Sequence, residues 1–597
     1  MMCATDEEMS ACEEDLYDMT SLPQENMRRG GIPFSAVYDW AARALVWALV
    51  VIFPIIMGPK TYRNITLVKM TAFGAIVGIF TVILVFTTIF FSDELHKEST
   101  LKIKTRPGLF RADTLFDAAL LGFIALALVS SIFAAPYDKA VYGQSASWLT
   151  AFAGQGNRNN GFIIQATYAM MFFVISKLLK PKAHDALIFV WGGLIFAVLC
   201  QLHLFGVDLY GVGKSVGEKY AGPFLSKKTE FMGPIGNVNL ASYFLTAACV
   251  LAAGLYINKV APKFDKYNIT TICSFAFLLW AELNINTDAG LVGLAAGFAI
   301  MIPVLAGSVA HVRRMMTVFS AAGLTMAFDK FLIDFLINGK SFGGSGKAGL
   351  AVGFVCALAA LVIWLLMERR GVSIAAKKLR ISAAVLLIVA VAGVLAAAYV
   401  SVAPEVDPVN GEIQTTFASP KSGGNPLTEL GHMLHGRFDD TYGHNRLFTW
   451  KRTLSVVKKQ PLIRTIIGSG PDSFTGAFAS YYGAESKVFF KGKRLDKAHN
   501  EFLDILINQG ILGLIAYLAF FGLLIWSAFR TLGRKNSGGA APALGVAVIA
   551  FLAHAFFGYQ LPIQSPIMWV MVALCGAFVI NSEQKDSQPQ SSGVIVN

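Results

Sequence analysis

Charged residues are scarce in this sequence. Only 15% of its 597 residues are Asp, Glu, Lys or Arg, whereas soluble domains contain about 25%. Hydrophobic residues make up 55% of the chain, and apolar runs of about 20 residues, long enough for a helix to cross a bilayer, recur along most of it. Because open strands cannot span lipid, each run is predicted to be a helix. The composition therefore excludes a soluble enzyme and predicts an all-α polytopic membrane protein.

Two further features are missing from particular regions. The first 35 residues are acidic and contain no apolar h-region, so we expect no cleaved signal peptide there. Of the seven cysteines, Cys3 and Cys12 lie in this N-terminal region, and none lies in the long polar segment 403–498. Disulfides are therefore not expected to stabilise that segment. Internal repeats and a soluble catalytic domain are not evident either.

Fourteen apolar runs are predicted to span the membrane. They are 36–57, 67–91, 114–135, 160–180, 184–204, 238–258, 269–287, 289–307, 315–337, 346–367, 381–402, 501–529, 540–559 and 566–581. Lys and Arg gather in every second loop between these runs, which is the positive-inside pattern. This pattern accounts for the net charge of +12 without nucleic-acid binding.

The basic loops predict that both termini are cytoplasmic. The domain organisation expected is a disordered cytoplasmic tail, transmembrane helices 1–11, a large extracytoplasmic loop with active-site segments, transmembrane helices 12–14 and a second cytoplasmic tail; these are residues 1–35, 36–402, 403–500, 501–581 and 582–597. The second half of the large loop is predicted to be structured. An amphipathic helix through Trp450 should end at Pro461, and a turn at 468–471 should precede the aromatic run 474–482.

The stretch 497–517 places a polar cluster at the start of an otherwise apolar helix. The cluster contains His499, Asn500, Glu501 and Asp504. Ionisable residues near lipid are costly and usually functional, and a neutral imidazole with an ordinary pKa of about 6.5 can accept a proton from a hydroxyl group. The two carboxylates equally suit the positive end of a helix, and His499 equally suits an interfacial anchor. The residues alone leave both interpretations open.

Several arginines lie in segments predicted to be extracytoplasmic. They are Arg158 in Gly-Asn-Arg-Asn-Asn-Gly, Arg446, Arg452 and Arg494. The planar guanidinium group pairs with phosphate oxygens at two points, so such a group suits a lipid pyrophosphate. Arginines on an anionic membrane surface are the alternative. We favour this alternative for Arg494, which lies in a basic run, and a functional role for Arg158 and Arg446.

Other polar groups admit structural explanations. Asn237 and Asn239 open a span and are able to cap its helix. Asp329, Lys330 and Asp334 lie in one predicted span, where Lys330 and Asp334 can pair at i, i+4. That pair either has a structural role or lines a cavity. Glu282 and Asp288 are similarly ambiguous.

A metal site is the less favoured interpretation of the histidines in the large loop. It would use His432, His435 and either Asp439 or Asp440, but the His-x-x-His spacing alone is a weak signal. We favour a solvated loop and predict no metal and no cofactor.

The order and spacing of these motifs resemble the O-antigen ligase/O-antigen polymerase superfamily. The resemblance rests on Arg446-x-x-x-Trp450, on Gly-Ser-Gly-Pro-Asp-Ser-Phe at 468–474, on Ala-His-Asn-Glu-Phe-Leu-Asp at 498–504, and on the glycines and tyrosine of 510–517. Upstream, Arg-Asn-Asn-Gly at 158–161 and Gly-Asn-Val-Asn at 236–239 are also similar to family segments. The similarity covers roughly residues 140–530.

The resemblance implies a GT-C-like glycosyltransferase of the bacterial cytoplasmic membrane. Such an enzyme moves a glycan from undecaprenyl pyrophosphate to a glycan, lipid or protein acceptor, in ligation or polymerisation of a cell-surface polysaccharide, without a required metal. His499 would activate the acceptor hydroxyl, and Arg446 would hold the pyrophosphate with help from Arg158. The other expected substrate-binding residues are Trp450, Asn500, Asp504, Asn237 and Asn239.

Two departures from the family pattern stand out. Thr287-Asp288-Ala-Gly290 occupies a place where family members often have Ser-Arg, and the predicted spans outnumber the usual count. Two other classes also remain open. A transporter or flippase for an envelope precursor would use Asp329, Lys330 and Asp334 as a substrate path, although the internal repeats typical of transporters are not evident. A non-catalytic scaffold is the third class.

Overall fold

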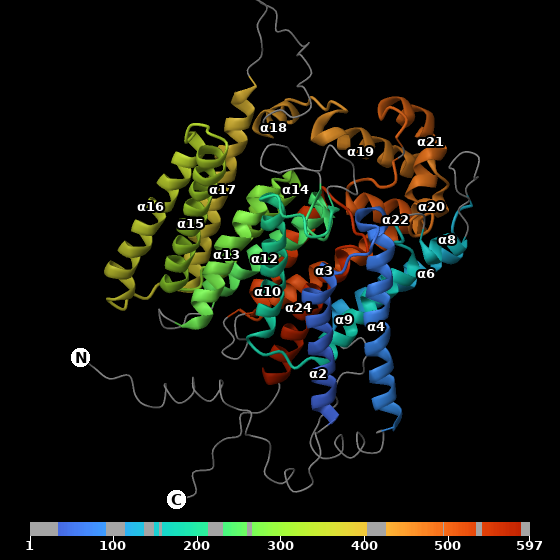
Figure 1. The fold of residues 1–597 in the computed structure, drawn as a ribbon, viewed down its shortest axis with the longest axis horizontal. Helices are drawn as coiled ribbons and strands as arrows, with labels where there is room; N and C mark the ends of the chain where they lie inside the picture. The colour runs from blue at the N-terminus through green and yellow to red at the C-terminus, as the bar shows by residue number, and fades with distance from the viewer. Residues whose placement is uncertain are drawn as a thin grey trace, which may run out of the picture.

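The computed structural model describes residues 34–90, 114–136, 148–154, 158–212, 231–258, 265–402, 426–493, 495–532 and 540–586. These residues form helices almost throughout (Figure 1). The strands described are β1 (Phe231–Met232) and β2 (Gly236–Asn237), which pair antiparallel. The predicted all-α polytopic class is confirmed. The predictions for Cys3, Cys12 and Arg494 lie outside the described residues.

The helices follow the predicted apolar runs closely. Those on predicted spans are α2 (Phe34–Trp47), continued by a π-helical turn and α3 (Phe53–Ile55), α4 (Ile65–Phe90), α6 (Leu115–Ile132), α9 (Phe162–Leu178), α10 (Asp185–Leu204), α12 (Val238–Asn258), α13 (Lys266–Ile285), α14 (Asp288–Leu305), α15 (Val309–Asp329), α16 (Gly344–Ile363), α17 (Ala376–Ser401), α22 (Glu501–Arg530), α23 (Ala540–Ala555) and α24 (Ser565–Asp586). Among the described residues, twelve helices are long and apolar enough to cross a membrane. The other two predicted spans fall on the shorter apolar helices α9 and α23. The count of fourteen therefore stays a prediction.

Helix α12 lies at the centre of the bundle. Every residue of its apolar window is buried, and it packs against α13, α14 and α23. Small residues let these helices approach closely: a Cβ added at Gly254 would lie 3.0 Å from the Ala543 side chain. Packing through small side chains is the usual basis of helix association in lipid.

Helices α16 and α17 lie at the opposite extreme. Only 6% of each apolar window is buried, and both are at one edge of the bundle (Figure 1). Their exposed residues are mostly apolar, as lipid contact requires, and the exposed Lys347, Lys377 and Lys378 lie near the helix starts. Helix α16 is held to α15 by close contact between Gly323, Gly349 and Gly353.

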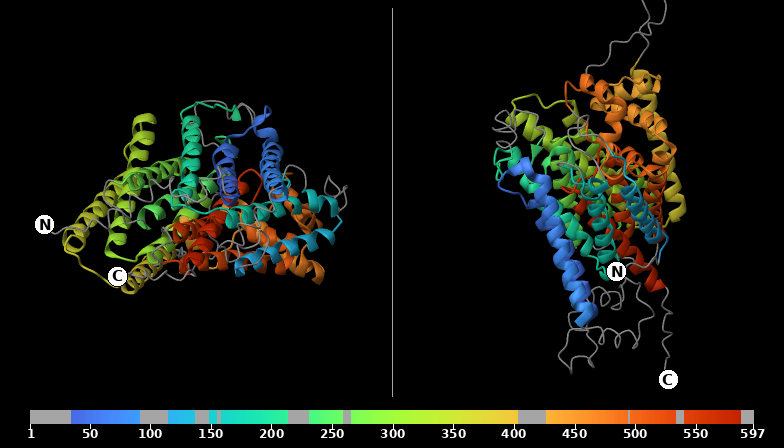
Figure 2. Two further views of the ribbon diagram at one scale, coloured as in Figure 1. Left: turned by 90° about the horizontal axis from the view of Figure 1, so that it is seen from below. Right: turned by 90° about the vertical axis from the view of Figure 1, so that its right-hand side faces the viewer.

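Four shorter helices from the second half of the predicted outer loop gather at one end of the bundle (Figures 1 and 2). They are α18 (Pro426–Leu434), α19 (Tyr442–Lys459), α20 (Leu462–Ile467) and α21 (Phe474–Phe489). Helix α19 ends immediately before Gln460 and Pro461, as predicted. A core of Phe448, Val456, Phe474, Phe478 and Ile507 joins α19 and α21 to the start of α22.

Candidate functional site

The loop that carries His499 lies between α21 and α22. Asn500 caps α22, because its Oδ1 accepts a hydrogen bond from the Leu503 amide at 3.0 Å. Asp504, one turn further on, accepts a hydrogen bond from the Ala498 amide at 2.9 Å. Both residues therefore shape the loop, and their predicted substrate contacts stay predictions. His499 itself has a φ of +53°, and only residues held by their surroundings keep such a backbone conformation.

A buried ion pair fixes the N-terminal side of this loop. The Lys497 Nζ lies 2.8 Å from Asp472 Oδ1, and the two side chains are 1% and 3% exposed. Burial alone would lower the pKa of Lys497, but the nearby carboxylates of Asp472 and Asp504 raise it above the ordinary lysine value. The lysine therefore stays charged. On another side, Trp450 Nε1 donates to the Ala498 carbonyl at 3.1 Å.

Two glycine-containing segments, 466–470 and 507–510, pack against each other through their backbones. Gly468 and Gly510 both have positive φ, +83° and +72°. A Cβ on Gly510 would lie 2.3 Å from the Ile466 carbonyl oxygen. Asn508 then ties the segments together, because its side-chain oxygen accepts from the Ser473 amide at 3.0 Å. The predicted continuous helix 501–529 is therefore interrupted at Gly510, since another backbone segment packs against it there.

Arg158 reaches the same site from a distant part of the chain. It precedes α9, and its guanidinium pairs with Asp496, with Nε 2.6 Å from Oδ2. Its Cζ also lies 5.6 Å from the centre of the Tyr559 ring. The Asn160 amide donates to Asp472 Oδ2 at 3.2 Å, so the carboxylate that holds Lys497 also anchors the Arg158 loop.

Arg446 occupies the first regular turn of α19. The three preceding residues, Gly443 to Asn445, are all left-handed, which concentrates backbone strain beside the arginine. The half-buried guanidinium donates one long hydrogen bond of 3.3 Å to the Gly443 carbonyl. Burial lowers the pKa of Arg446, and the charge of Asp288 opposes this shift. Among the described residues no carboxylate ion-pairs with Arg446, so its charge is available to an anion.

The positive charges of Arg446 and Arg158 both act on His499. Burial, followed by the positive charges of Arg446 and Arg158, lowers its pKa to about 4, against a partial opposing effect of Asp496. The imidazole is therefore neutral near pH 7. Its ring packs edge-on against Tyr559, with centroids 5.0 Å apart. The structure thus brings together three predicted site residues.

Tyr559, Asp472 and Asp496 were not predicted as site residues. Asp472 directly follows the predicted turn at 468–471, within the motif 468–474, and Tyr559 is the last residue of the predicted span 540–559. A signal was present: residues 556–564, Phe-Phe-Gly-Tyr-Gln-Leu-Pro-Ile-Gln, are aromatic and polar between two apolar runs. Glu501 is connected to this loop, because its carboxylate accepts from the Gln560 amide at 2.7 Å.

Asn237, Asn239, Asp288 and Trp450 were also singled out from the sequence, and each has an identified contact in the structure. Asn237 Oδ1 accepts from the Asn239 amide at 3.0 Å at the start of α12, which is a capping arrangement; substrate binding by these two residues stays a prediction. Asp288 Oδ2, at the start of α14, lies 3.2 Å from His444 Nε2 in α19. The Trp450 ring packs on Phe556 and Phe557, 5.3 and 5.7 Å between centroids.

Other ambiguous groups find structural partners. Glu282 is buried and accepts from the Ser242 hydroxyl. Lys330 lies 3.4 Å from Asp334 and 3.7 Å from Asp329. His435 stacks on Tyr399. In the part of the chain that is described, no three metal-ligating side chains converge.

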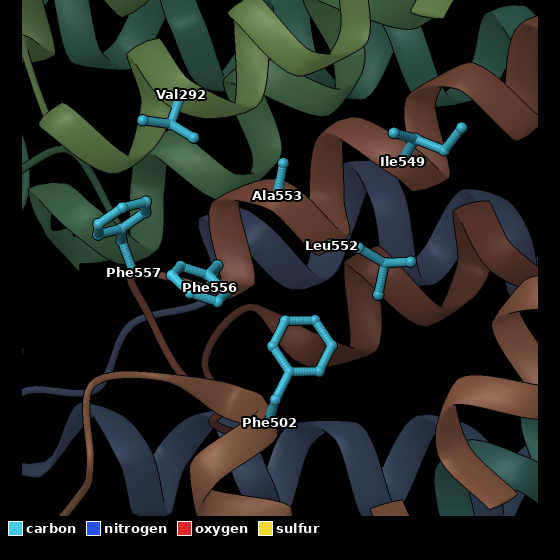
Figure 3. A pocket seen from close by; sticks show the side chains of 7 residues that line it. All are labelled: Val292, Phe502, Ile549, Leu552, Ala553, Phe556 and Phe557. Atoms are coloured by element: carbon cyan, nitrogen blue, oxygen red, sulfur yellow. The ribbon is translucent and has the colours of Figure 1, made fainter. Parts of the chain in front are cut away.

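An open apolar pocket of about 370 Å³ adjoins the site (Figure 3). Its walls come from α14, the first turn of α22, α23 and the residues that follow α23, and all lining side chains are apolar: Val292, Phe502, Ile549, Leu552, Ala553, Phe556 and Phe557. Phe502 and Phe556 connect the pocket to the His499 loop and to Trp450. The pocket therefore offers a place for hydrocarbon next to a positively charged polar cluster.

Residues 342–518 match the profile of a family described as O-antigen ligase. A comparison with curated proteins finds no match. The matched stretch contains Arg446, Trp450 and His499 but ends before Tyr559. It confirms the predicted resemblance to the O-antigen ligase/O-antigen polymerase superfamily and supports a ligase- or polymerase-like function in polysaccharide assembly. Together with the apolar helices, it indicates a multi-pass protein of the bacterial inner membrane.

Proposed function

We propose that this protein is a glycosyltransferase that moves a glycan from undecaprenyl pyrophosphate to an acceptor hydroxyl group, in the ligation or polymerisation of a cell-surface polysaccharide. The observation that carries the proposal is the convergence of a neutral imidazole, His499, with Arg446 and Arg158 beside an apolar pocket. The family match over residues 342–518 supports the same reaction class.

The reaction needs a base and a stabilised leaving group. The acceptor oxygen attacks the anomeric carbon, and His499 takes the proton of the acceptor hydroxyl. The bond between the anomeric carbon and the pyrophosphate oxygen breaks, and its electron pair leaves with undecaprenyl pyrophosphate. Arg446 and Arg158 stabilise the charge on this leaving group through paired, charge-assisted hydrogen bonds.

Donor binding tunes the base. A histidine whose pKa is about 4 is neutral but weakly basic. Since the charges of Arg446 and Arg158 contribute to this low pKa, a bound pyrophosphate that neutralises them raises the pKa of His499. The imidazole then becomes a stronger base only when the donor is present, which suppresses proton transfer in an empty site.

The apolar pocket supports a prenyl-linked donor. Its lining residue Phe502 lies in the first turn of α22, directly after the His499 loop. The first isoprene units would fill the pocket while the pyrophosphate lies at Arg446. We also propose that the end of the bundle that carries α18 to α21 faces outward. Loops rich in Lys and Arg mark the cytoplasmic side, and they alternate along the sequence with the loops on the side of α18 to α21.

The test uses purified protein in lipid nanodiscs with glycan-loaded undecaprenyl pyrophosphate and a matched acceptor. Release of undecaprenyl pyrophosphate and growth of a glycan product are followed together. His499→Ala should reduce transfer by about 10²–10⁴-fold, the usual contribution of a general base. His435→Ala is the matched control, because this histidine stacks on Tyr399 of α17; we expect a normal rate. A normal rate in His499→Ala would contradict the catalytic role, and no release by the wild type would favour transport or scaffolding.

A further inference from the structure

Two buried side chains close to Arg446 have polar atoms without hydrogen-bond partners. Tyr243 of α12 and His554 of α23 are 1% and 0% exposed, and their rings lie 3.7 Å apart. Among the described residues, neither the Tyr243 hydroxyl nor either imidazole nitrogen of His554 has a partner. Buried polar groups are almost always hydrogen-bonded, so two adjacent exceptions require an explanation.

The pair is connected both to the arginine cluster and to a wall of the apolar pocket. A Cβ on Gly558 would lie 2.4 Å from the Tyr243 hydroxyl oxygen, and Gly558 immediately precedes Tyr559, whose ring contacts His499 and Arg158. The charge of Arg446 acts electrostatically on both Tyr243 and His554. Next to His554 in sequence, Ala553 lines the pocket.

We propose that Tyr243 and His554 donate hydrogen bonds to the pyrophosphate of the donor lipid, beside Arg446. The inference rests on the proposed function. It adds two uncharged hydrogen-bond donors to the phosphate site that Arg446 and Arg158 form. A hydroxyl and a neutral imidazole each supply one donor without adding charge, and hydrogen bonds to a charged acceptor are stronger than those between neutral groups.

Both side chains are covered in this structure, so the phosphate must enter between them and Arg446. Arg446 is weakly held, because its guanidinium makes a single long hydrogen bond to the Gly443 carbonyl. Its side chain can therefore move to let the phosphate enter. Tyr243 and His554 come from helices that pack against each other in the centre of the bundle. They are therefore rigidly placed, as preorganised donors must be.

The experiment measures the dissociation constant of undecaprenyl pyrophosphate for the full chain in nanodiscs, together with melting temperature and glycan transfer. Tyr243→Phe and His554→Phe should weaken binding by about tenfold to hundredfold, as expected for loss of one bond to a charged group. His554→Gln keeps a donor and should recover part of the affinity. Tyr168→Phe is the matched control. It also removes a buried tyrosine hydroxyl, but the Tyr168 ring stacks on Trp569 instead of lying beside His554.

The melting temperature separates binding from folding. Tyr243→Phe removes a buried hydroxyl that has no partner, so its melting temperature should equal or exceed that of the wild type while its affinity falls. A merely structural role would not produce this combination. Unchanged affinity in Tyr243→Phe would overturn the inference, even if His554→Phe fails to fold.

Failure of the proposed function gives a different result. In that case the wild type neither binds undecaprenyl pyrophosphate nor transfers a glycan, and the inference fails with it. His499→Ala should lose transfer but keep the wild-type dissociation constant, which assigns binding and proton transfer to different residues. Wild-type transfer with normal affinity in the Tyr243 and His554 variants would reject the inference alone.

Discussion

Breaking the buried ion pair between Asp472 and Lys497 should destabilise the fold and the His499 loop together. The two charged atoms are 2.8 Å apart, and both side chains are almost fully buried. Asp472→Asn removes the negative charge and leaves the lysine without its principal partner. Removal of one member of a buried pair typically costs about 3–5 kcal/mol, because the remaining charge is desolvated and uncompensated.

The double variant isolates the interaction. Lys497→Met alone should lower the free energy of unfolding by a similar amount, since it leaves the Asp472 charge buried. The double variant Asp472→Asn/Lys497→Met should lose far less than the sum, because it contains no unpaired charge. The pair also depends on pH in a defined direction. The folded-state pKa of Lys497 is raised above its ordinary value of 10.5. The ion pair therefore contributes to the free energy of unfolding at pH values below 10.5, and this contribution is lost as the pH rises through the folded-state pKa.

The assay is reversible unfolding of the detergent-solubilised protein by titration with denaturant, combined with glycan transfer in nanodiscs. We expect transfer to fall in Asp472→Asn even where the protein remains folded, because the same carboxylate holds both the Lys497 side and the Arg158 loop through Asn160. Single variants within about 0.5 kcal/mol of the wild type, with additive effects in the double variant, would refute the reasoning, since such values are typical of exposed pairs.

Three other predictions follow from the site. Arg446→Gln removes a cation that lowers the pKa of His499, so this pKa, followed by NMR of labelled histidine, should rise; an unchanged value would show that the two residues do not interact. Asp288→Asn removes an exposed negative charge near Arg446 and should tighten donor binding a few-fold at low salt, with the gain lost at high salt; a gain that persists in high salt would argue against an electrostatic cause. Gly510→Ala should destabilise the protein by about 1–3 kcal/mol, because φ is +72° and a Cβ would lie 2.3 Å from a carbonyl oxygen. Gly522→Ala in the same helix, where a Cβ meets nothing within 4 Å, should be neutral or stabilising, and equal melting temperatures for the two variants would contradict this explanation.

Much of the fold could be predicted because membrane helices are encoded locally. An apolar run of sufficient length has one stable conformation in lipid, whatever its neighbours are. The predicted apolar runs accordingly coincide with helices. The amphipathic helix predicted through Trp450 is also present, as α19. The interruption of α22 at Gly510 was not predicted, because it arises from the backbone of residues 466–468, which are distant in sequence.

The candidate site was predicted in part. His499, Arg446 and Arg158 were identified from motif order and chemistry, and the structure places them within electrostatic reach of each other. Asn500 and Asp504 were identified by the same reasoning, but their observed bonds cap and brace the loop. A polar residue at a helix start has the same sequence signature in both roles, so only its partners distinguish them.

The sequence by itself determined that this chain is a helical membrane protein and where its ionisable residues gather. Both follow from transfer free energies that act on each segment separately. Only the tertiary structure decided that Asp472 pairs with Lys497, that Asp496 pairs with Arg158, and that the Tyr559 ring packs against His499. These contacts join segments with no common periodicity, and they depend on which helices become neighbours. That choice is made by the packing of side chains across the whole bundle.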